Sequence, residues 1–128
     1  MTEKIERTEK TVLVVDDDPS TCDLIREMLD SKDYRVIIAH DGLEAFEYTQ
    51  RGRVDLILMD IRMPFFSGYW FCDAFKHKKN TANIPIVIVS GILDEEGVER
   101  AYKAGACAAV KKPFKTQELL DVISRNTD

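Results

Sequence analysis

The sequence predicts an α/β protein in which five parallel strands form one sheet with helices on both faces. Short apolar runs recur five times along the chain, and amphipathic stretches separate them. Three of these runs, the first, third and fourth, are almost continuously apolar, which is typical of parallel strands covered on both faces. Strands that alternate with helices favour a parallel sheet, because each connecting helix packs back onto that sheet.

The expected strands are short runs rich in valine, isoleucine and leucine. In chain order they are residues 11–15, 34–39, 54–59, 84–89 and 107–110. After each strand, apolar residues at helical spacing predict an amphipathic helix. The expected apolar stripes are Leu24, Ile25, Met28 and Leu29; Leu43, Phe46 and Tyr48; Phe71, Cys72 and Phe75; Val98, Ala101 and Tyr102; and Leu119, Leu120 and Ile123.

Capping residues mark the expected helix ends. Asp18 or Ser20 suits the N-cap of the first helix, and Pro19 suits its first turn. Gly52 and Gly105 stand where C-caps are expected.

Length and charge limit the class of protein. A chain of 128 residues fits one domain, which we expect over residues 11–126 after a flexible, polar tail at residues 1–10. The formal net charge of −5 disfavours a protein that holds nucleic acid or anionic lipid mainly by charge. No apolar run is long enough for a membrane span or a signal core, so we expect a cytoplasmic protein without membrane insertion.

The three cysteines are odd in number, widely spaced and flanked by apolar residues. We therefore expect Cys22, Cys72 and Cys107 to be reduced, buried and inert, rather than disulfide-bonded or bound to zinc.

Polar residues follow four of the expected strands. Asp16-Asp17-Asp18 follows the first strand, Asp60 the third, Ser90 the fourth and Lys111-Lys112-Pro113 the fifth. Ligands bind at the carboxyl ends of strands in open parallel sheets, so these side chains are expected to meet at one edge. A single acid there is often only a helix cap, but several carboxylates held close together take up protons unless a cation compensates their charge.

This set of side chains predicts a site for Mg²⁺ and a phosphoryl group. Mg²⁺ prefers hard oxygen ligands and leaves positions open for phosphate oxygens and water. Asp60 is the best candidate nucleophile because it stands alone after a central strand, whereas Asp16 and Asp17 form a pair that suits the metal. The Ser90 hydroxyl and the Lys112 ammonium are each suited to one phosphoryl oxygen.

Four segments resemble the signature segments of response-regulator receiver domains. They are Val14–Pro19; Leu58–Pro64 with Ser67 and Gly68; Val89–Gly91; and Ala104–Ala106 through Lys112–Phe114. They occur in the family's order, and the likeness covers roughly residues 10–126. The resemblance implies a flavodoxin-like (βα)5 fold with strand order 2-1-3-4-5.

The resemblance also implies a phosphoryl acceptor and its metal ligands. A phosphohistidine on a sensor histidine kinase or a histidine phosphotransfer protein would donate to Asp60. Asp17 would bind Mg²⁺ directly and Asp16 mainly through water. Asp60 and the backbone carbonyl of Arg62 would complete the protein ligands.

Ser90 matches the family's switch hydroxyl, and Lys112 matches the lysine that contacts the phosphoryl group, because Lys-Pro-Phe follows the family spacing. Family likeness further suggests a cis bond between Lys112 and Pro113. The implied protein is a phospho-switch rather than an enzyme. It would assist only its own phosphorylation and dephosphorylation, and its output would be contact with a downstream protein rather than with nucleic acid.

The sequence departs from the family pattern at two places. Ala109 stands where Tyr or Phe usually couples to the switch hydroxyl, so we expect a weak or altered response on the usual output face. Phe65 and Phe66, followed by Trp70, add aromatic residues beside Asp60. Trp70 is then either an exposed anchor for a partner or a cover for its own loop.

Two other functions compete with this interpretation. Asp16 and Asp18 imitate the Asp-x-Asp of haloacid-dehalogenase-type phosphatases, in which the first Asp is the nucleophile. Alternatively, the chain is a receiver-shaped interaction module that is never phosphorylated.

Overall fold

The computed structural model describes residues 9–127. Most of the expected tail, residues 1–8, therefore lies outside the described residues. Among residues 9–127, no helix has the length and apolar character that a membrane span requires.

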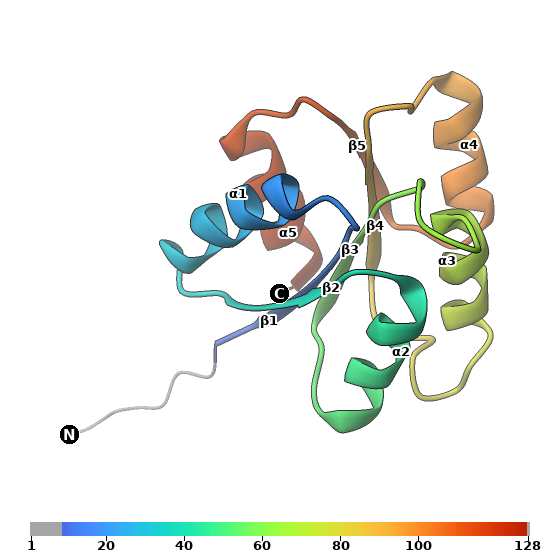
Figure 1. Cartoon of the computed structure of the whole chain (residues 1–128), viewed down its shortest axis with the longest axis horizontal. Coiled ribbons are helices and arrows are strands. Elements are labelled where there is room, and N and C mark those ends of the chain that lie inside the picture. Colours follow the sequence, from blue (N-terminus) through green and yellow to red (C-terminus); the bar gives the residue numbers. More distant parts are fainter. Residues whose placement is uncertain (1–8, 128) are drawn as a thin grey trace.

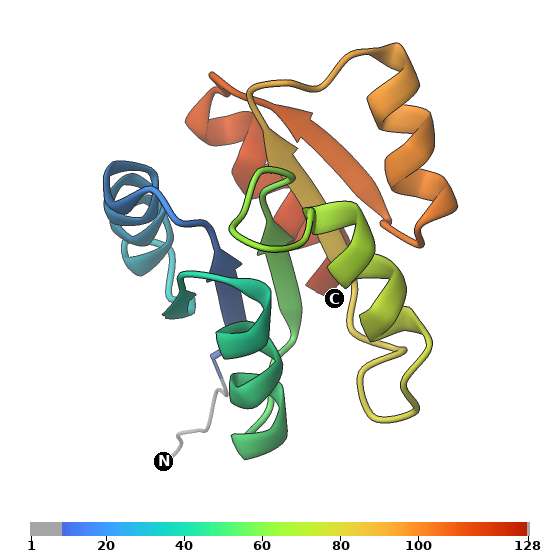
Figure 2. The same ribbon diagram turned by 45° about the vertical axis from the view of Figure 1, so that its right-hand side comes forward.

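Five strands and five helices alternate along the described chain (Figures 1 and 2). The strands are β1 (Thr11–Val15), β2 (Arg35–Ala39), β3 (Leu56–Met59), β4 (Ile86–Ser90) and β5 (Ala108–Lys111). The helices are α1 (Pro19–Asp30), α2 (Gly42–Arg51), α3 (Gly68–Lys76), α4 (Glu95–Lys103) and α5 (Thr116–Thr127). All strands pair in parallel in the order β2-β1-β3-β4-β5. The predicted fold class and strand order are confirmed.

The helices form two layers around the sheet. In Figure 1, α1 and α5 cover one face, and α2, α3 and α4 cover the other. Alternate β1 residues divide between two apolar clusters: Val12 and Val14 join the cluster under α1 and α5, whereas Leu13 and Val15 join the cluster under α2, α3 and α4. Because successive side chains of a strand point to opposite faces, one apolar run supplies both cores.

The expected caps are present. Asp18 is the N-cap of α1 and accepts a hydrogen bond from the Ser20 backbone N–H at 3.2 Å. Gly52 caps the C-terminus of α2. Gly105 lies one residue beyond the C-cap of α4 with φ at +107°, a left-handed conformation that suits glycine.

Three of the predicted stripe residues, Leu24, Leu43 and Tyr102, are exposed. The buried stripe of α1 is Cys22, Ile25 and Leu29, whose spacing of three and four residues follows the helical repeat. Leu24 lies about 100° around the helix from Ile25, on the edge of this stripe, and is exposed. Leu43 is likewise exposed at the start of α2.

The prediction of three buried cysteines is wrong for Cys107, which is exposed. Cys107 immediately precedes β5, which is an edge strand of the sheet, so it has a neighbouring strand on one side only. Cys22 and Cys72 are buried as expected, and burial raises the pKa of each thiol to about 11. The three cysteines are free.

We expect iodoacetamide to alkylate Cys107 alone in the folded protein and all three cysteines in denaturant. The thiolate is the reactive form, and although Cys107 is exposed, partial shielding of its sulfur from water raises the pKa of its thiol. Its alkylation rate should therefore keep rising at pH values where an ordinary thiol is already ionised. Mass spectrometry of the alkylated peptides measures this result, with Cys107→Ser as the control that removes the label. Rapid labelling of Cys22 or Cys72 in the native protein would contradict it.

Candidate functional site

The carboxyl edge of the sheet brings together residues from four strand ends. Asp16 follows β1, Asp60 follows β3, Ser90 ends β4 and Lys112 follows β5. The backbone N–H of Asp60 donates to the Val15 carbonyl at 3.0 Å, which fixes the ends of the two central strands side by side. The sequence therefore places these side chains at one edge because the sheet is parallel throughout.

Lys112 lies between two buried carboxylates. Its Nζ donates to Asp16 Oδ2 at 2.9 Å and lies 3.6 Å from Asp60 Oδ2. Burial by itself lowers the pKa of Lys112, but the hydrogen bond to Asp16 and the charge of Asp60 outweigh it and raise that pKa. The ammonium is therefore firmly charged where a phosphoryl group on Asp60 would need a counter-charge. The neighbouring Lys111 is exposed at the end of β5.

Asp60 is held where its negative charge is unfavourable. The residue is 8% exposed, and burial, followed by repulsion from Asp16, raises its pKa. The charge of Lys112 and hydrogen bonds from Ser90 and from the Ile61 backbone N–H, at 2.7 Å to Oδ1, reduce this effect without cancelling it. A bound cation would relieve the repulsion.

Three carboxylates form a candidate metal site. Oxygen atoms of Asp16, Asp17 and Asp60 all lie within 4.8 Å of one another. Asp17 is exposed and the other two are buried, so the site opens to solvent on one side. Hard oxygen donors with an open side fit Mg²⁺, which retains water or phosphate oxygens when bound to protein. Arg62, whose carbonyl was predicted as a further ligand, is exposed two residues beyond Asp60.

Ser90 is placed to connect the site with the chain that leads to α4. The residue is buried, and its Oγ accepts a hydrogen bond from the Ile92 backbone N–H at 3.3 Å. Its hydrogen bond also lowers the pKa of Asp60. The Ser90 side chain therefore lies between Asp60 and the start of the β4–α4 loop.

Gly68 has a role that sequence reasoning missed. Its N–H donates to the Ile61 carbonyl at 2.8 Å, and a Cβ on this residue would lie 2.1 Å from the Asp60 carbonyl oxygen. The start of α3 therefore packs directly on the backbone of Asp60. Ser67 and Gly68 belong to the receiver-like segment after Asp60, but their spacing in the sequence does not reveal this close approach.

Tyr69 forms a second unpredicted contact. Its hydroxyl donates to the Gly97 carbonyl at 3.1 Å, and the Arg100 guanidinium lies 4.4 Å from the centre of its ring. These contacts join α3 to α4. Ala109, at the usual aromatic position, is partly buried in β5. The expected weak response of that face stays a prediction.

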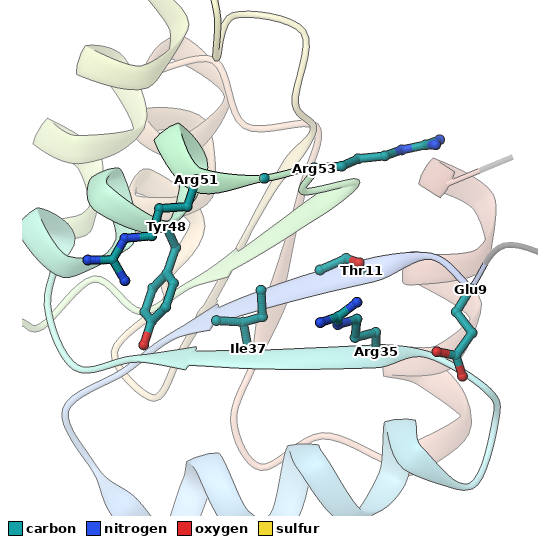
Figure 3. A pocket seen from close by; sticks show the side chains of 8 residues that line it. Glu9, Thr11, Arg35, Ile37, Tyr48, Arg51 and Arg53 are labelled. Carbon is teal, nitrogen blue, oxygen red and sulfur yellow. The ribbon is translucent and has the colours of Figure 1, made fainter.

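A separate concavity lies at the opposite end of the sheet. This cavity of about 380 Å³ lies beside Thr11 and Arg35, which begin β1 and β2. Figure 3 shows the side chains that line it. Its charged groups do not converge: Arg51 lies 5.7 Å from the Tyr48 ring centre, and Arg53 points away from the cavity and pairs with Asp55 at 2.9 Å. This cavity lacks the carboxylate cluster and is separate from the site at the carboxyl edge.

Known proteins resemble this chain over nearly its whole length. The sequence model of the response regulator receiver domain matches residues 12–124. The polar-differentiation response regulator DivK of Brucella anthropi is 30% identical over 89% of this chain and 93% of its own length. The response regulator GtcR of Aneurinibacillus migulanus is 32% identical over 85% of this chain, which spans only 44% of that relative.

Solved structures agree with the sequence relatives. The chemotaxis protein CheY4 of Vibrio cholerae superposes with a TM-score of 0.87 at 29% identity, covering 93% of this chain and 99% of CheY4. The receiver domain of the Pseudomonas aeruginosa sensor histidine kinase PA1611 superposes with a TM-score of 0.85 at 32% identity, covering 94% of this chain and 98% of that domain. That structure holds a magnesium ion in its active-site cleft.

The family match, the strand order and the acidic cluster at the carboxyl edge agree with one another. This chain belongs to the response regulator receiver domains of two-component signal transduction, a family whose members work as phospho-switches.

Proposed function

We propose that Asp60 accepts a phosphoryl group from a phosphohistidine on a sensor histidine kinase or a histidine phosphotransfer protein. The observation that carries this proposal is the placement of Asp60, a buried carboxylate with a raised pKa, beside the Lys112 ammonium and the acidic cluster. A carboxylate oxygen of Asp60 forms the new O–P bond while the P–N bond of the donor breaks. The electron pair stays on the donor histidine nitrogen, which then takes up a proton.

Each neighbour of Asp60 has a distinct part in this proposal. Lys112 meets one phosphoryl oxygen, and the Ser90 hydroxyl meets another and carries the change into the β4–α4 loop. Asp16, Asp17, Asp60 and the Arg62 carbonyl would hold Mg²⁺, which supplies positive charge to the transferring group when bound. In-line transfer needs little beyond positioning and charge neutralisation.

The domain, residues 11–126, then acts as a switch and not as an enzyme with a separate substrate. It assists its own phosphorylation and dephosphorylation, and it presents an altered surface to a downstream protein. The change at Asp60 would reach this surface through Ser90, because the Ser90 hydroxyl contacts both Asp60 and the Ile92 backbone.

The phosphatase alternative fits the contacts poorly. Both oxygens of Asp16 are engaged, one by Lys112 and the other by the Asp18 backbone N–H at 2.9 Å. Asp18 caps α1, and hydrogen bonds from the Thr21 hydroxyl and the Ser20 backbone lower its pKa, so that at neutral pH it is ionised and has no proton to donate as a general acid.

The test is incubation of the protein with acetyl phosphate and Mg²⁺, followed by location of the modified carboxylate by mass spectrometry. Label on Asp60 supports the switch. Label on Asp16 would favour the phosphatase, and absence of label from acetyl phosphate and from phosphorylated histidine donors would favour an unphosphorylated interaction module.

Mg²⁺ is expected to stabilise the folded protein. Mg²⁺ at about one hundred times its dissociation constant raises the free energy of unfolding by about 2.7 kcal/mol if only the folded state binds it. Asp17→Asn should remove most of this increase, because it takes one charged ligand from the cluster. The measurement is thermal unfolding with and without Mg²⁺, and exposed Asp23→Asn on α1 is the matched control. Equal Mg²⁺ responses of Asp17→Asn and the wild type would contradict the assignment.

A further inference from the structure

Three aromatic side chains form an exposed patch at the β3–α3 loop and the first turn of α3. Phe65 is 85% exposed, Phe66 45% and Trp70 51%. The rings of Phe66 and Trp70 stack at 4.4 Å, and Trp70 also meets the buried Phe71 edge-on at 5.1 Å. Trp70 therefore stacks on Phe66 of its own loop and is also half exposed, and its role as an anchor for a partner stays a prediction. We call Phe65, Phe66 and Trp70 the aromatic patch.

The aromatic patch borders a groove of about 500 Å³ between α3 and α4. Arg100 and Lys103 of α4 line its other side, and Asp73 is the acidic residue in its lining. The Asp73 carboxylate lies 3.6 Å from the His77 ring. Two cations therefore flank an apolar surface in a chain whose net charge is −5. Aromatic residues and arginine are enriched at the centres of protein interfaces, and Lys103 adds a positive charge beside them.

Phe65 is held in an unfavourable conformation. Its φ is +74°, and the Phe66 N–H donates to the Pro64 carbonyl at 2.8 Å, which closes a three-residue turn around it. A bulky residue rarely adopts positive φ, and such strain concentrates at binding sites. The turn keeps the ring of Phe65, the most exposed of the patch, in contact with water, so its apolar surface does not contribute to folding stability.

We propose that the groove between α3 and α4 binds an acidic segment of a partner protein that carries an aromatic or large aliphatic anchor. The anchor packs on the aromatic patch, and carboxylates of the segment pair with Arg100 and Lys103. Arg100 is already positioned by its contact with the Tyr69 ring at 4.4 Å, so its ordering costs little on binding. The net charge of the chain opposes nucleic acid as the occupant.

Binding is tested without acetyl phosphate or Mg²⁺. A failure of phosphorylation at Asp60 then leaves this test unaffected. The full chain is immobilised and used to select from a random peptide library displayed on phage. Enriched peptides are expected to combine Asp or Glu with Trp, Phe or Leu, and their dissociation constants are measured by fluorescence anisotropy.

Three variants locate the bound peptide. Trp70→Ala and Lys103→Glu should each weaken binding about tenfold or more, as loss of an interface anchor does. Phe65→Gly should also weaken binding, whereas its melting temperature should equal or exceed that of the wild type because glycine tolerates positive φ. Tyr102→Ala is the matched control, since Tyr102 is exposed on the other side of α4 beside Glu95 and Glu99. It should leave binding unchanged.

Several results would overturn the proposal. One is enrichment of no peptide, or of basic peptides. Another is acidic peptides whose affinity survives both Trp70→Ala and Lys103→Glu. Concentration-dependent dimerisation that Trp70→Ala abolishes in sedimentation velocity would identify a second copy as the occupant. Binding of single-stranded oligothymidine that Lys103→Glu abolishes would identify nucleic acid.

Discussion

Asp60→Asn is expected to reduce labelling by acetyl phosphate below detection and to raise the melting temperature in the absence of divalent ions. The amide cannot act as the nucleophile. The gain in stability follows from the pKa of Asp60, which burial and Asp16 raise in the folded protein. Folding therefore favours the protonated carboxyl, and the stability that this group contributes falls as pH rises from the ordinary aspartate value through the raised value. At neutral pH the ionised form costs stability, and asparagine removes that cost.

The two readouts of Asp60→Asn distinguish a lost acceptor from a damaged fold. Labelling is measured by intact mass, and melting by circular dichroism in chelator. Exposed Asp121→Asn on α5 is the control and should match the wild type in both measurements. Persistent labelling of Asp60→Asn would refute Asp60 as the acceptor. A lower melting temperature would refute the electrostatic account of Asp60 while leaving the assignment of the acceptor in place.

Gly68→Ala is expected to lower the free energy of unfolding by about 3 kcal/mol, near the upper end for an added methyl group in a packed position. Its Cβ would lie 2.1 Å from the Asp60 carbonyl oxygen, and the obstacle is backbone rather than a flexible side chain. Relief of this clash moves Asp60 relative to Lys112, and a displacement of about 1 Å in a reacting group costs up to about 100-fold in rate. We expect a loss of that order in the initial rate of labelling.

Gly91→Ala provides a matched control beside the same site. Gly91 follows Ser90, and a Cβ there meets nothing within 4 Å. The free energy of unfolding of Gly91→Ala should stay within about 0.5 kcal/mol of the wild-type value, as for an ordinary surface substitution. Alanine is also a better helix former than glycine, so propensity alone would make Gly68→Ala the more stable protein. If Gly68→Ala has wild-type stability and labelling, the loop after Asp60 can move aside at little cost. That result would contradict the clash that the structure indicates.

The sequence was sufficient to predict the sheet and the composition of the site. Near-continuous apolar runs mark buried parallel strands, and in a parallel sheet every residue that follows a strand lies at the same edge. The positions of Asp16, Asp60, Ser90 and Lys112 follow from that rule alone. The acidic cluster was predictable for the same reason, because Asp17 is adjacent to Asp16.

Contacts between neighbouring helices were not predictable in this way. The Tyr69 hydroxyl reaches Gly97 because α3 and α4 pack at a particular distance, which the periodicity of either helix leaves open. The exposure of Cys107 was not predictable either. Its neighbours in the sequence are apolar, but it lies beside an edge strand of the sheet. The positive φ of Phe65 had no signal either, since glycine rather than phenylalanine marks that conformation.

The hydrogen bond between Lys112 and Asp16 joins residues 96 positions apart in the chain. The site therefore does not exist in a chain whose synthesis has stopped before β5, even when β1 and β3 have already paired around Asp60. Contacts of this sequence separation form late, because closing so long a loop must precede them. If Asp60 accepts a phosphoryl group as proposed, Lys112 can meet that group only once β5 has joined the sheet. A nascent or partly unfolded copy would then lack the counter-charge that the proposed signalling state needs.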